Sequence, residues 1–295
     1  MLPKHTPYAN SSKPLEIGLR PLDLSYWIEP DEHLPRYLNE KRRLLSEIPE
    51  RVFVSELDSG DVQSEVLELL LQHLLENHSD QWSKQDGKVH VAGHEVDLAD
   101  DKTPDLVKAS LMVQEDLVTM RKADDGWRIA AACVCFPSSW VLIEKVGKPL
   151  HDIHAPVPGF AKGTRNAIMI ERIFDNLPVD QPVERFNWSV YKDDILYHDD
   201  SWRDHFPDAE AVNQNNYFLR IERQTLRKLP VTGDILFTVR IHIDPIETLS
   251  RREDRAELIP GFIKSIEALP EDVMIYKGFD GGRDLLIERL EGMLD

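Results

Sequence analysis

Two segments in the first half of the chain repeat apolar residues at the spacing of a helix face. The stronger is Val62 to Glu76, where apolar residues recur three and four positions apart. Ser59 stands at its expected N-cap, and Asp61 falls in its first turn. A more charged segment, Leu34 to Ile48, repeats the pattern and stops before Pro49. The sequence therefore predicts two amphipathic helices that each bury one face.

The polar stretch that follows, Asn77 to Asp105, contains Gly87 and Gly93 and predicts a small hairpin. Thr103-Pro104 then opens a short helix that is expected to end near Leu111. The sequence has no internal repeat and no low-complexity tract.

Beyond Val113 the pattern changes to short runs that are typical of strands. The turn signal Asp124-Asp125-Gly126 separates the first two runs and predicts a hairpin. Trp140 to Gly159 predicts a short strand that runs into a helical segment broken by prolines, and Ala167 to Asn176 predicts a helix. Three further strands are predicted, at Arg185–Tyr191, Tyr217–Thr225 and Asp234–Ile243. Helices are predicted again at Glu257–Leu269 and Asp284–Leu294.

This order of elements places the chain in the α+β class. Two strands, a helical insert and three more strands make a five-stranded antiparallel sheet with a pocket between the sheet and the insert. That is the order of a PAS domain, which we expect over residues 112–245. Residues 16–111 and 246–295 are expected to be helical extensions of this core, and residues 1–15 a flexible lead-in.

The charge of the chain argues against nucleic acid as a partner. Fifty-three acidic and thirty-five basic residues give a net charge of −18. The short basic runs Lys41-Arg42-Arg43 and Arg251-Arg252 are each followed by acidic residues, whereas duplex binding needs clustered basic side chains. We therefore expect neither nucleic acid nor an anionic membrane as a partner. A cationic substrate or a basic protein fits the charge better.

The sequence also limits where the protein works. The N-terminus lacks the apolar core of a signal peptide, and no apolar run approaches the ~20 residues of a membrane span. The only cysteines, Cys133 and Cys135, lie two residues apart in a strand-like run, an awkward spacing for a disulfide between them. We therefore expect a protein of a reducing compartment, the cytoplasm, with the lumen of an organelle as the alternative.

Several longer stretches of the chain carry a resemblance that composition does not explain. They are GLRPLD (Gly18–Asp23) followed by Trp27-Ile28, VQEDLV (Val113–Val118), CFPSSW (Cys135–Trp140), EKVGKPLHDIHAPVPG (Glu144–Gly159), FNW (Phe186–Trp188) and LRIERQTLRKLP (Leu219–Pro230). Together they resemble the α-subunit family of haem-dependent oxidative N-demethylases, from residue 18 to about residue 270.

The resemblance implies a PAS-like domain that binds haem b through its iron. It implies a monooxygenase-type oxidoreductase that uses O2 to demethylate a small secondary amine, dimethylamine in members of the family. NADPH electrons are then expected to arrive through a separate flavin and iron–sulfur reductase. No nucleotide-binding glycine fingerprint is present, so we do not expect NADPH to bind this chain.

Haem in such a pocket needs one neutral imidazole on the iron, provided by the helical insert. Between Trp140 and Arg185 the only histidines are His151 and His154. We prefer His154 as the metal ligand, because Pro156 breaks the helix directly after it and fixes the local backbone. His151 is the alternative, and either residue is otherwise expected to cap a helix C-terminus.

Other residues enter the expected haem site with different roles. Arg172 and Arg165, on or next to the insert helix, are candidates to pair with the haem propionates. A thiolate from Cys133 or Cys135 is the alternative iron ligand, although cysteine in an apolar strand usually behaves as a small buried hydrophobe. Asn187 is a further residue able to reach the pocket.

The strand YFLRIERQT (217–225) is unusually polar, and it supplies the candidate catalytic residues. A carboxylate there holds an ammonium or takes its proton, and an arginine stabilises negative charge that builds near the iron. We rank Glu222 first and Arg223 second, with Arg220 and Gln224 behind. Neighbouring residues of a flat strand point to opposite faces, so Glu222 and Arg223 share one pocket only across a bulge; otherwise Arg220 and Glu222 point into it together. The alternative is a solvent-exposed, salt-bridged sheet face.

Two rival functions stay open at this point. A haem-based gas or redox sensor uses the same fold, and a haemless PAS-like binding protein keeps only the scaffold. A sensor normally needs an output segment. The helical residues 257–295 are too short for a catalytic output and lack a long heptad seam, which favours the enzyme.

Overall fold

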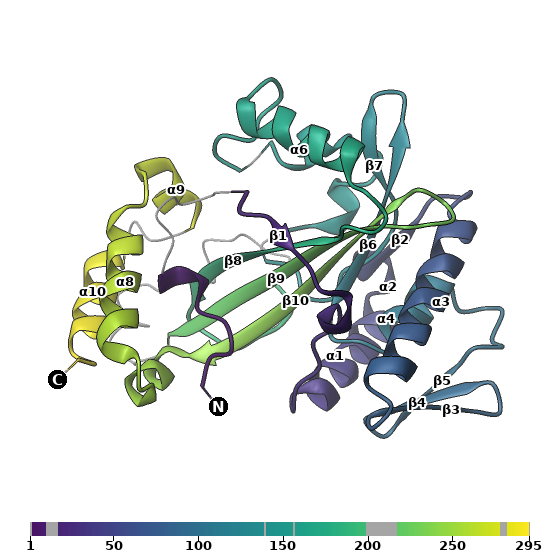
Figure 1. Cartoon of the computed structure of the whole chain (residues 1–295), viewed down its shortest axis with the longest axis horizontal. Coiled ribbons are helices and arrows are strands. Elements are labelled where there is room, and N and C mark those ends of the chain that lie inside the picture. The colour runs from purple at the N-terminus through teal and green to yellow at the C-terminus, as the bar shows by residue number, and fades with distance from the viewer. Residues whose placement is uncertain are drawn as a thin grey trace.

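The computed structural model describes residues 2–9, 17–138, 140–155, 157–198, 217–277 and 282–294. Within these ranges the chain forms a large antiparallel sheet, a small three-stranded sheet and surrounding helices (Figure 1). The large sheet has seven strands in the order β1-β8-β9-β10-β6-β7-β2.

The five central strands confirm the predicted strand segments. They are β6 (Asp116–Ala123), β7 (Gly126–Cys133), β8 (Val183–Tyr191), β9 (Phe218–Lys228) and β10 (Ile235–Pro245). The expected turn at Asp124-Asp125 joins β6 to β7 as an antiparallel hairpin. The sheet is wider than the five strands expected, because β1 (Arg20–Pro21) and β2 (Phe53–Ser55) pair with its two edges.

Helices from the first half of the chain pack beside β6, β7 and β10. They are α1 (Leu34–Glu47), α2 (Pro49–Val52), α3 (Gly60–Asn77) and α4 (Asp105–Ser110), which confirms the predicted amphipathic helices. Ser59 is the N-cap of α3 by position, but its hydroxyl donates to the Glu56 carbonyl and caps no backbone N–H. Asp61 instead accepts the N–H of Val62 at 2.8 Å.

The polar stretch after α3 forms a three-stranded sheet where a two-stranded hairpin was expected. Its strands are β3 (Trp82–Gln85), β4 (Lys88–Val91) and β5 (His94–Asp97). Each turn contains two successive residues with positive φ, Asp86-Gly87 and Ala92-Gly93. Such turns join short antiparallel strands tightly, so the second glycine adds a third strand.

The helical insert covers one face of the large sheet (Figure 1). It contains η3 (Leu142–Glu144), α5 (Leu150–Ile153) and α6 (Arg165–Asn176). Its apolar side chains pack with Leu226 and Ile235, and we call the sheet face that carries these two residues the insert face. The short strand predicted at the start of this segment is wrong: Leu142 begins a 3₁₀ turn and is buried in the apolar cluster under the insert.

The two ends of the chain pack together on the opposite face. The C-terminal elements are η5 (Ile246–Arg251), α8 (Arg255–Glu267), α9 (Glu271–Tyr276) and α10 (Arg283–Glu291). The short N-terminal helix η1 (Pro7–Ala9) lies against α8, and Tyr8 is fully buried there. A Cβ atom on Gly261 would lie 2.3 Å from the Ala9 carbonyl oxygen, so this contact needs glycine. Part of the expected lead-in is therefore packed, while residues 10–16 lie outside the described residues.

Two further expectations concern helices and thiols. No helix among the described residues is long and apolar enough to cross a membrane. Cys133 and Cys135 are both free and buried, with their sulfur atoms 4.0 Å apart, which confirms that they form no disulfide.

The buried His73 of α3 makes stability sensitive to acid. Burial lowers its pKa from 6.5 to about 4, and nearby His78 and Arg227 add to the effect. Between pH 6.5 and pH 4 the unfolded chain therefore binds a proton that the folded protein excludes. The free energy of unfolding is expected to fall by up to about 3 kcal/mol as the pH decreases through this window.

Urea unfolding of His73→Phe across this pH range tests the effect. The variant keeps a ring beside Trp27, whose centroid lies 5.3 Å from that of His73, but it has nothing to titrate. Its stability is expected to depend less on pH than that of the wild type, while His90→Gln, a control at a half-exposed histidine, should follow the wild type. An unchanged acid limb in His73→Phe would contradict the assignment.

Candidate functional site

His154 follows α5 and presents one nitrogen for ligation. Its Nδ1 lies 3.0 Å from the carbonyl oxygen of Leu150. A carbonyl only accepts, so Nδ1 carries the proton and Nε2 keeps its lone pair. Burial lowers the pKa of the imidazole, and the positive charges of Arg185 and Lys145 lower it further. His154 is thus a neutral imidazole of fixed tautomer, the form that binds a metal.

His151, on the same short helix, is placed differently. Its Nδ1 lies 3.1 Å from Glu171 Oε1, and its Nε2 lies 3.6 Å from Asp152 Oδ1. Both ring nitrogens therefore face carboxylates. This arrangement favours a structural role for His151.

The strand β9 divides its polar side chains between the two faces of the sheet. Glu222 and Gln224 alternate with Arg223 and point to the insert face, as Leu226 does. Gln224 Nε2 donates to Glu222 Oε2 at 2.8 Å, and Asn187 Nδ2 donates to the same oxygen at 3.4 Å. The Glu222 carboxylate is therefore held by two amides and is half-buried.

Two cations flank this carboxylate, and the sequence pattern identified neither as a site residue. Arg185 on β8 donates to Gln224 Oε1 at 3.3 Å. Lys277, just after α9, is buried and donates to the Trp188 carbonyl and, at 3.4 Å, to Asn187 Oδ1. Burial lowers the pKa of Lys277 to about 8, Glu222 opposes this shift, and Arg185 adds to it. The Lys277 ammonium is therefore close to losing its proton near neutral pH.

These residues form one group, which we call the polar cluster. Its members are Asn187, Glu222 and Gln224 with the cations Arg185 and Lys277. The positive charge of Arg185 lowers the pKa both of Lys277 and of His154, so Arg185 lies near both groups. No motif in the sequence links Lys277 to β8, because Lys277 and its partner Asn187 lie about ninety residues apart.

Arg223 lies on the opposite face from Glu222. Its Nε donates to Glu184 Oε2 at 2.7 Å, and its other nitrogens donate to the carbonyls of Trp27 and Tyr26 at 3.0 and 2.7 Å. Glu184 also accepts from Arg20 at 2.8 Å. Arg223 therefore connects β9 to the segment that precedes α1.

Arg220 lies on the insert face, but its guanidinium is already bonded. It donates to Ser138 Oγ and to the Phe136 carbonyl, both at 2.9 Å, and it stacks 5.2 Å from the Tyr191 ring centroid. Longer bonds reach the carbonyls of Ile195 and Leu196. Arg220 thus connects the loop after β7 to the loop after β8.

Arg165 and Arg172 line an open cleft of about 1330 Å³ between α6 and the chain around β1. The cleft wall is mainly apolar, and Ile168 and Met169 in it are 51% and 39% exposed. Neither His154 nor any member of the polar cluster lines the cleft. Val183 does, and it lies two residues before Arg185 on the same face of β8. The cleft therefore opens beside the polar cluster.

The cleft has the properties of a site for a large, mainly apolar ligand with acidic groups. Its apolar wall suits an apolar ligand, and two guanidinium groups at the cleft suit carboxylates. The neutral imidazole offers a metal ligand, and the polar cluster offers a carboxylate beside two cations.

The comparison with known families agrees with the motifs in the sequence. A family model described as "Haem-dependent oxidative N-demethylase, alpha subunit-like" matches residues 18–287. The match covers most of the chain and contains His154, the polar cluster and the cleft. It confirms the predicted resemblance.

The Arg223–Glu184 pair allows a test of its structural role. Arg223→Met leaves a buried carboxylate with one cation fewer and two carbonyls without their donor, so it should lower the free energy of unfolding by roughly 3 kcal/mol. The double variant Arg223→Met/Glu184→Leu should regain part of this loss. Urea unfolding measures both. Unchanged stability in Arg223→Met would contradict the structural role.

Proposed function

Since this chain belongs to the haem-dependent oxidative N-demethylase alpha subunit-like family, we propose that it is the catalytic subunit of such an enzyme, binding haem b and oxidising a small amine with O2. The observation that carries the proposal is the tautomer of His154. Nδ1–H donates a hydrogen bond to the Leu150 carbonyl, and Nε2 stays available for iron.

The arrangement of the sheet supports a PAS-like fold. The five central strands run β7-β6-β10-β9-β8 across the sheet, and the insert lies between the hairpin and the last three strands. In this proposal residues 112–245 form the haem-binding core. Residues 16–111 and 246–295 are extensions that support it.

The residues present fit haem. A neutral imidazole of fixed tautomer suits the iron, and Arg165 and Arg172 of the same insert suit the two propionates. His154 would hold the iron, and the two arginines would pair with the propionates. When bound, haem supplies the O2 chemistry. Arg220 and Arg223 are bonded elsewhere and act on the site only by holding the chain around it.

The polar cluster provides groups for the amine. A secondary amine is a cation at neutral pH, and Glu222 is the carboxylate that pairs with it. Gln224 and Asn187 orient Glu222 by donating to its Oε2. Arg185 and Lys277 favour negative charge that develops nearby, and Lys277 Nζ, with a pKa of about 8, takes or gives a proton.

The electrons come from outside this chain. Membership of an alpha-subunit family implies a partner subunit. The partner in this proposal is a flavin and iron–sulfur reductase that oxidises NADPH, because this sequence has no dinucleotide-binding glycine fingerprint. In this proposal the protein is cytoplasmic.

Replacement of the two insert histidines tests the iron ligand. His154→Ala should lose the Soret band of the haem-loaded protein, whereas His151→Ala should keep it, because both of its nitrogens face carboxylates. Absorption spectra before and after dithionite measure this, and added imidazole should restore the band in His154→Ala. Loss of the band only in His151→Ala would reverse the assignment, and a wild type without haem would remove the proposal.

Replacement of Glu222 tests the amine site. Glu222→Gln keeps the amide contacts but removes the negative charge, so amine-dependent O2 consumption should fall about 100-fold or more while the haem spectrum stays unchanged. Glu171→Gln is the control, because this carboxylate contacts only His151 among the proposed site residues. A silent Glu222→Gln would contradict the role of Glu222. A haem spectrum that no amine alters would instead favour a gas or redox sensor.

A further inference from the structure

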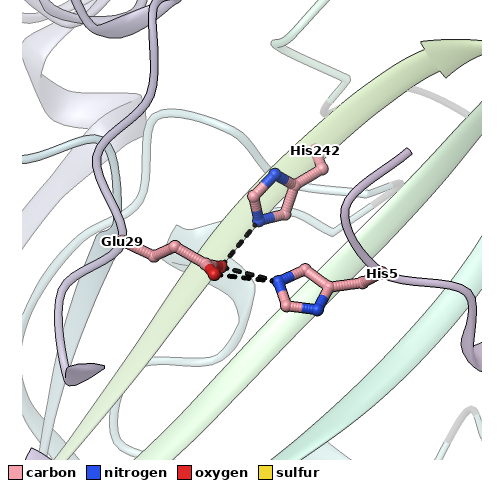
Figure 2. A group of neighbouring side chains, drawn as sticks. All are labelled: His5, Glu29 and His242. Atoms are coloured by element: carbon pink, nitrogen blue, oxygen red, sulfur yellow. Dashed lines mark hydrogen bonds and ion pairs between the residues drawn. The ribbon is translucent and has the colours of Figure 1, made fainter. Parts of the chain in front are cut away.

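Three side chains from distant parts of the chain meet on the face opposite the insert (Figure 2). His5 comes from the N-terminal segment, Glu29 from the loop after η2 (Leu24–Tyr26), and His242 from β10. His5 Nε2 lies 3.0 and 2.8 Å from the two oxygens of Glu29. His242 Nε2 lies 3.1 Å from the second of these oxygens. Each imidazole therefore directs its Nε2 atom at the Glu29 carboxylate.

This group is separate from the polar cluster. In the register of β9 and β10, His242 is opposite Ile221, and Ile241 is opposite Glu222. Because side chains alternate along a strand, His242 and Glu222 point to opposite faces of the sheet.

We propose that His5, Glu29 and His242 bind a divalent transition-metal ion of the zinc type, which fastens the N-terminal segment to the sheet. Two imidazoles and one carboxylate are a common ligand set for such ions, with one position left for water. The three ligand atoms lie within 4.8 Å of one another. Bonds of ~2.0–2.1 Å in a tetrahedral site separate ligand atoms by about 3.3 Å, so the contacts of Glu29 need to open by only a few tenths of an ångström.

The surroundings of the buried imidazole suit a metal. His242 is 8% exposed, so water competes little for its Nε2. Asp31 Oδ2 lies 3.9 Å from His242 Nδ1 and adds negative charge on the far side of the ring.

The cations around the group do not block the site. Lys4 pairs with Glu29 through a side chain that is 57% exposed, so it can withdraw into water when a metal takes its place as the counter-ion. Arg223 Nε lies 3.9 Å from Glu29, but its guanidinium is bonded to Glu184 and two carbonyls. A bound metal would therefore displace the exposed ammonium of Lys4 and leave the guanidinium of Arg223 in place.

The position of His5 is set by packing that involves no metal. Its ring packs 4.6 Å from the Phe186 ring, centroid to centroid. Further along the segment Tyr8 is fully buried, and Ala9 lies over the glycine of α8 described above. His5 is therefore held near Glu29 and His242 without a metal. His5 also precedes the family match, which begins at residue 18, whereas Glu29 and His242 lie within it.

A zinc titration tests the proposal. The full chain without a histidine tag is dialysed against a chelator, titrated with ZnCl2 by calorimetry, and analysed for zinc and iron by mass spectrometry. We expect one zinc per chain with a Kd of about 1 μM or lower, counted separately from haem iron. Bound zinc should also raise the thermal midpoint of the wild type.

Single variants then identify the ligands. Loss of an outer-shell partner already costs ~10–100-fold in metal affinity, so His5→Ala should weaken zinc binding by about 100-fold or more. His5 lies in a terminal segment, so this variant should fold, which circular dichroism checks. Glu29→Gln should weaken binding as well, and His90→Ala is the matched control that should not.

Two results would overturn the site. One is wild-type protein that retains no zinc after titration. The other is zinc affinity that is the same in His5→Ala and His90→Ala. Because zinc and haem iron are counted in the same samples, failure of the zinc site leaves the haem proposal unaffected, and the reverse also holds.

Discussion

The alternation of side chains along β9 is the constraint on which the rest of the structure depends. The strand is central in a sheet that is covered on both faces, so each polar residue on it needs a partner on its own side. Arg223 finds Glu184 and two carbonyls, and this contact fixes the chain that enters the first helix. Glu222, one residue earlier, faces the insert together with Gln224. One strand thus supports the scaffold with one face and the candidate site with the other.

The same alternation explains how so many charges are tolerated near the core. Each buried charge on β9 has a hydrogen-bonded partner, which removes most of the desolvation penalty that an isolated ion carries. On the insert face the balance is different, since Arg185 and Lys277 flank the single carboxylate of Glu222. Burial lowers the pKa of Lys277 to about 8, Glu222 opposes this shift, and the positive charge of Arg185 adds to it. The face that carries the proposed chemistry therefore holds a buried lysine close to a carboxylate.

Elements long enough to show a periodic hydrophobic pattern could be predicted from the sequence. Contacts between residues far apart in the sequence could not. α3 and the three long strands have clear periodicity, whereas β1 and β2, with two and three residues, are too short to show any. The choice of His154 over His151 rested on Pro156, which lies outside the described residues, and the structure favours the same residue through the Leu150 carbonyl. Lys277 and His5 carried no local signal, because the fold alone brings them to their partners.

The central claim is that the Nε2 atom of His154 holds haem iron, and the resonance Raman spectrum of the ferrous, haem-loaded protein tests it most directly. The account predicts an iron–imidazole stretching band in the wild type that is absent in His154→Gly and returns when free imidazole is added. A band that persists unchanged in His154→Gly would contradict the account, because iron would then have another protein ligand.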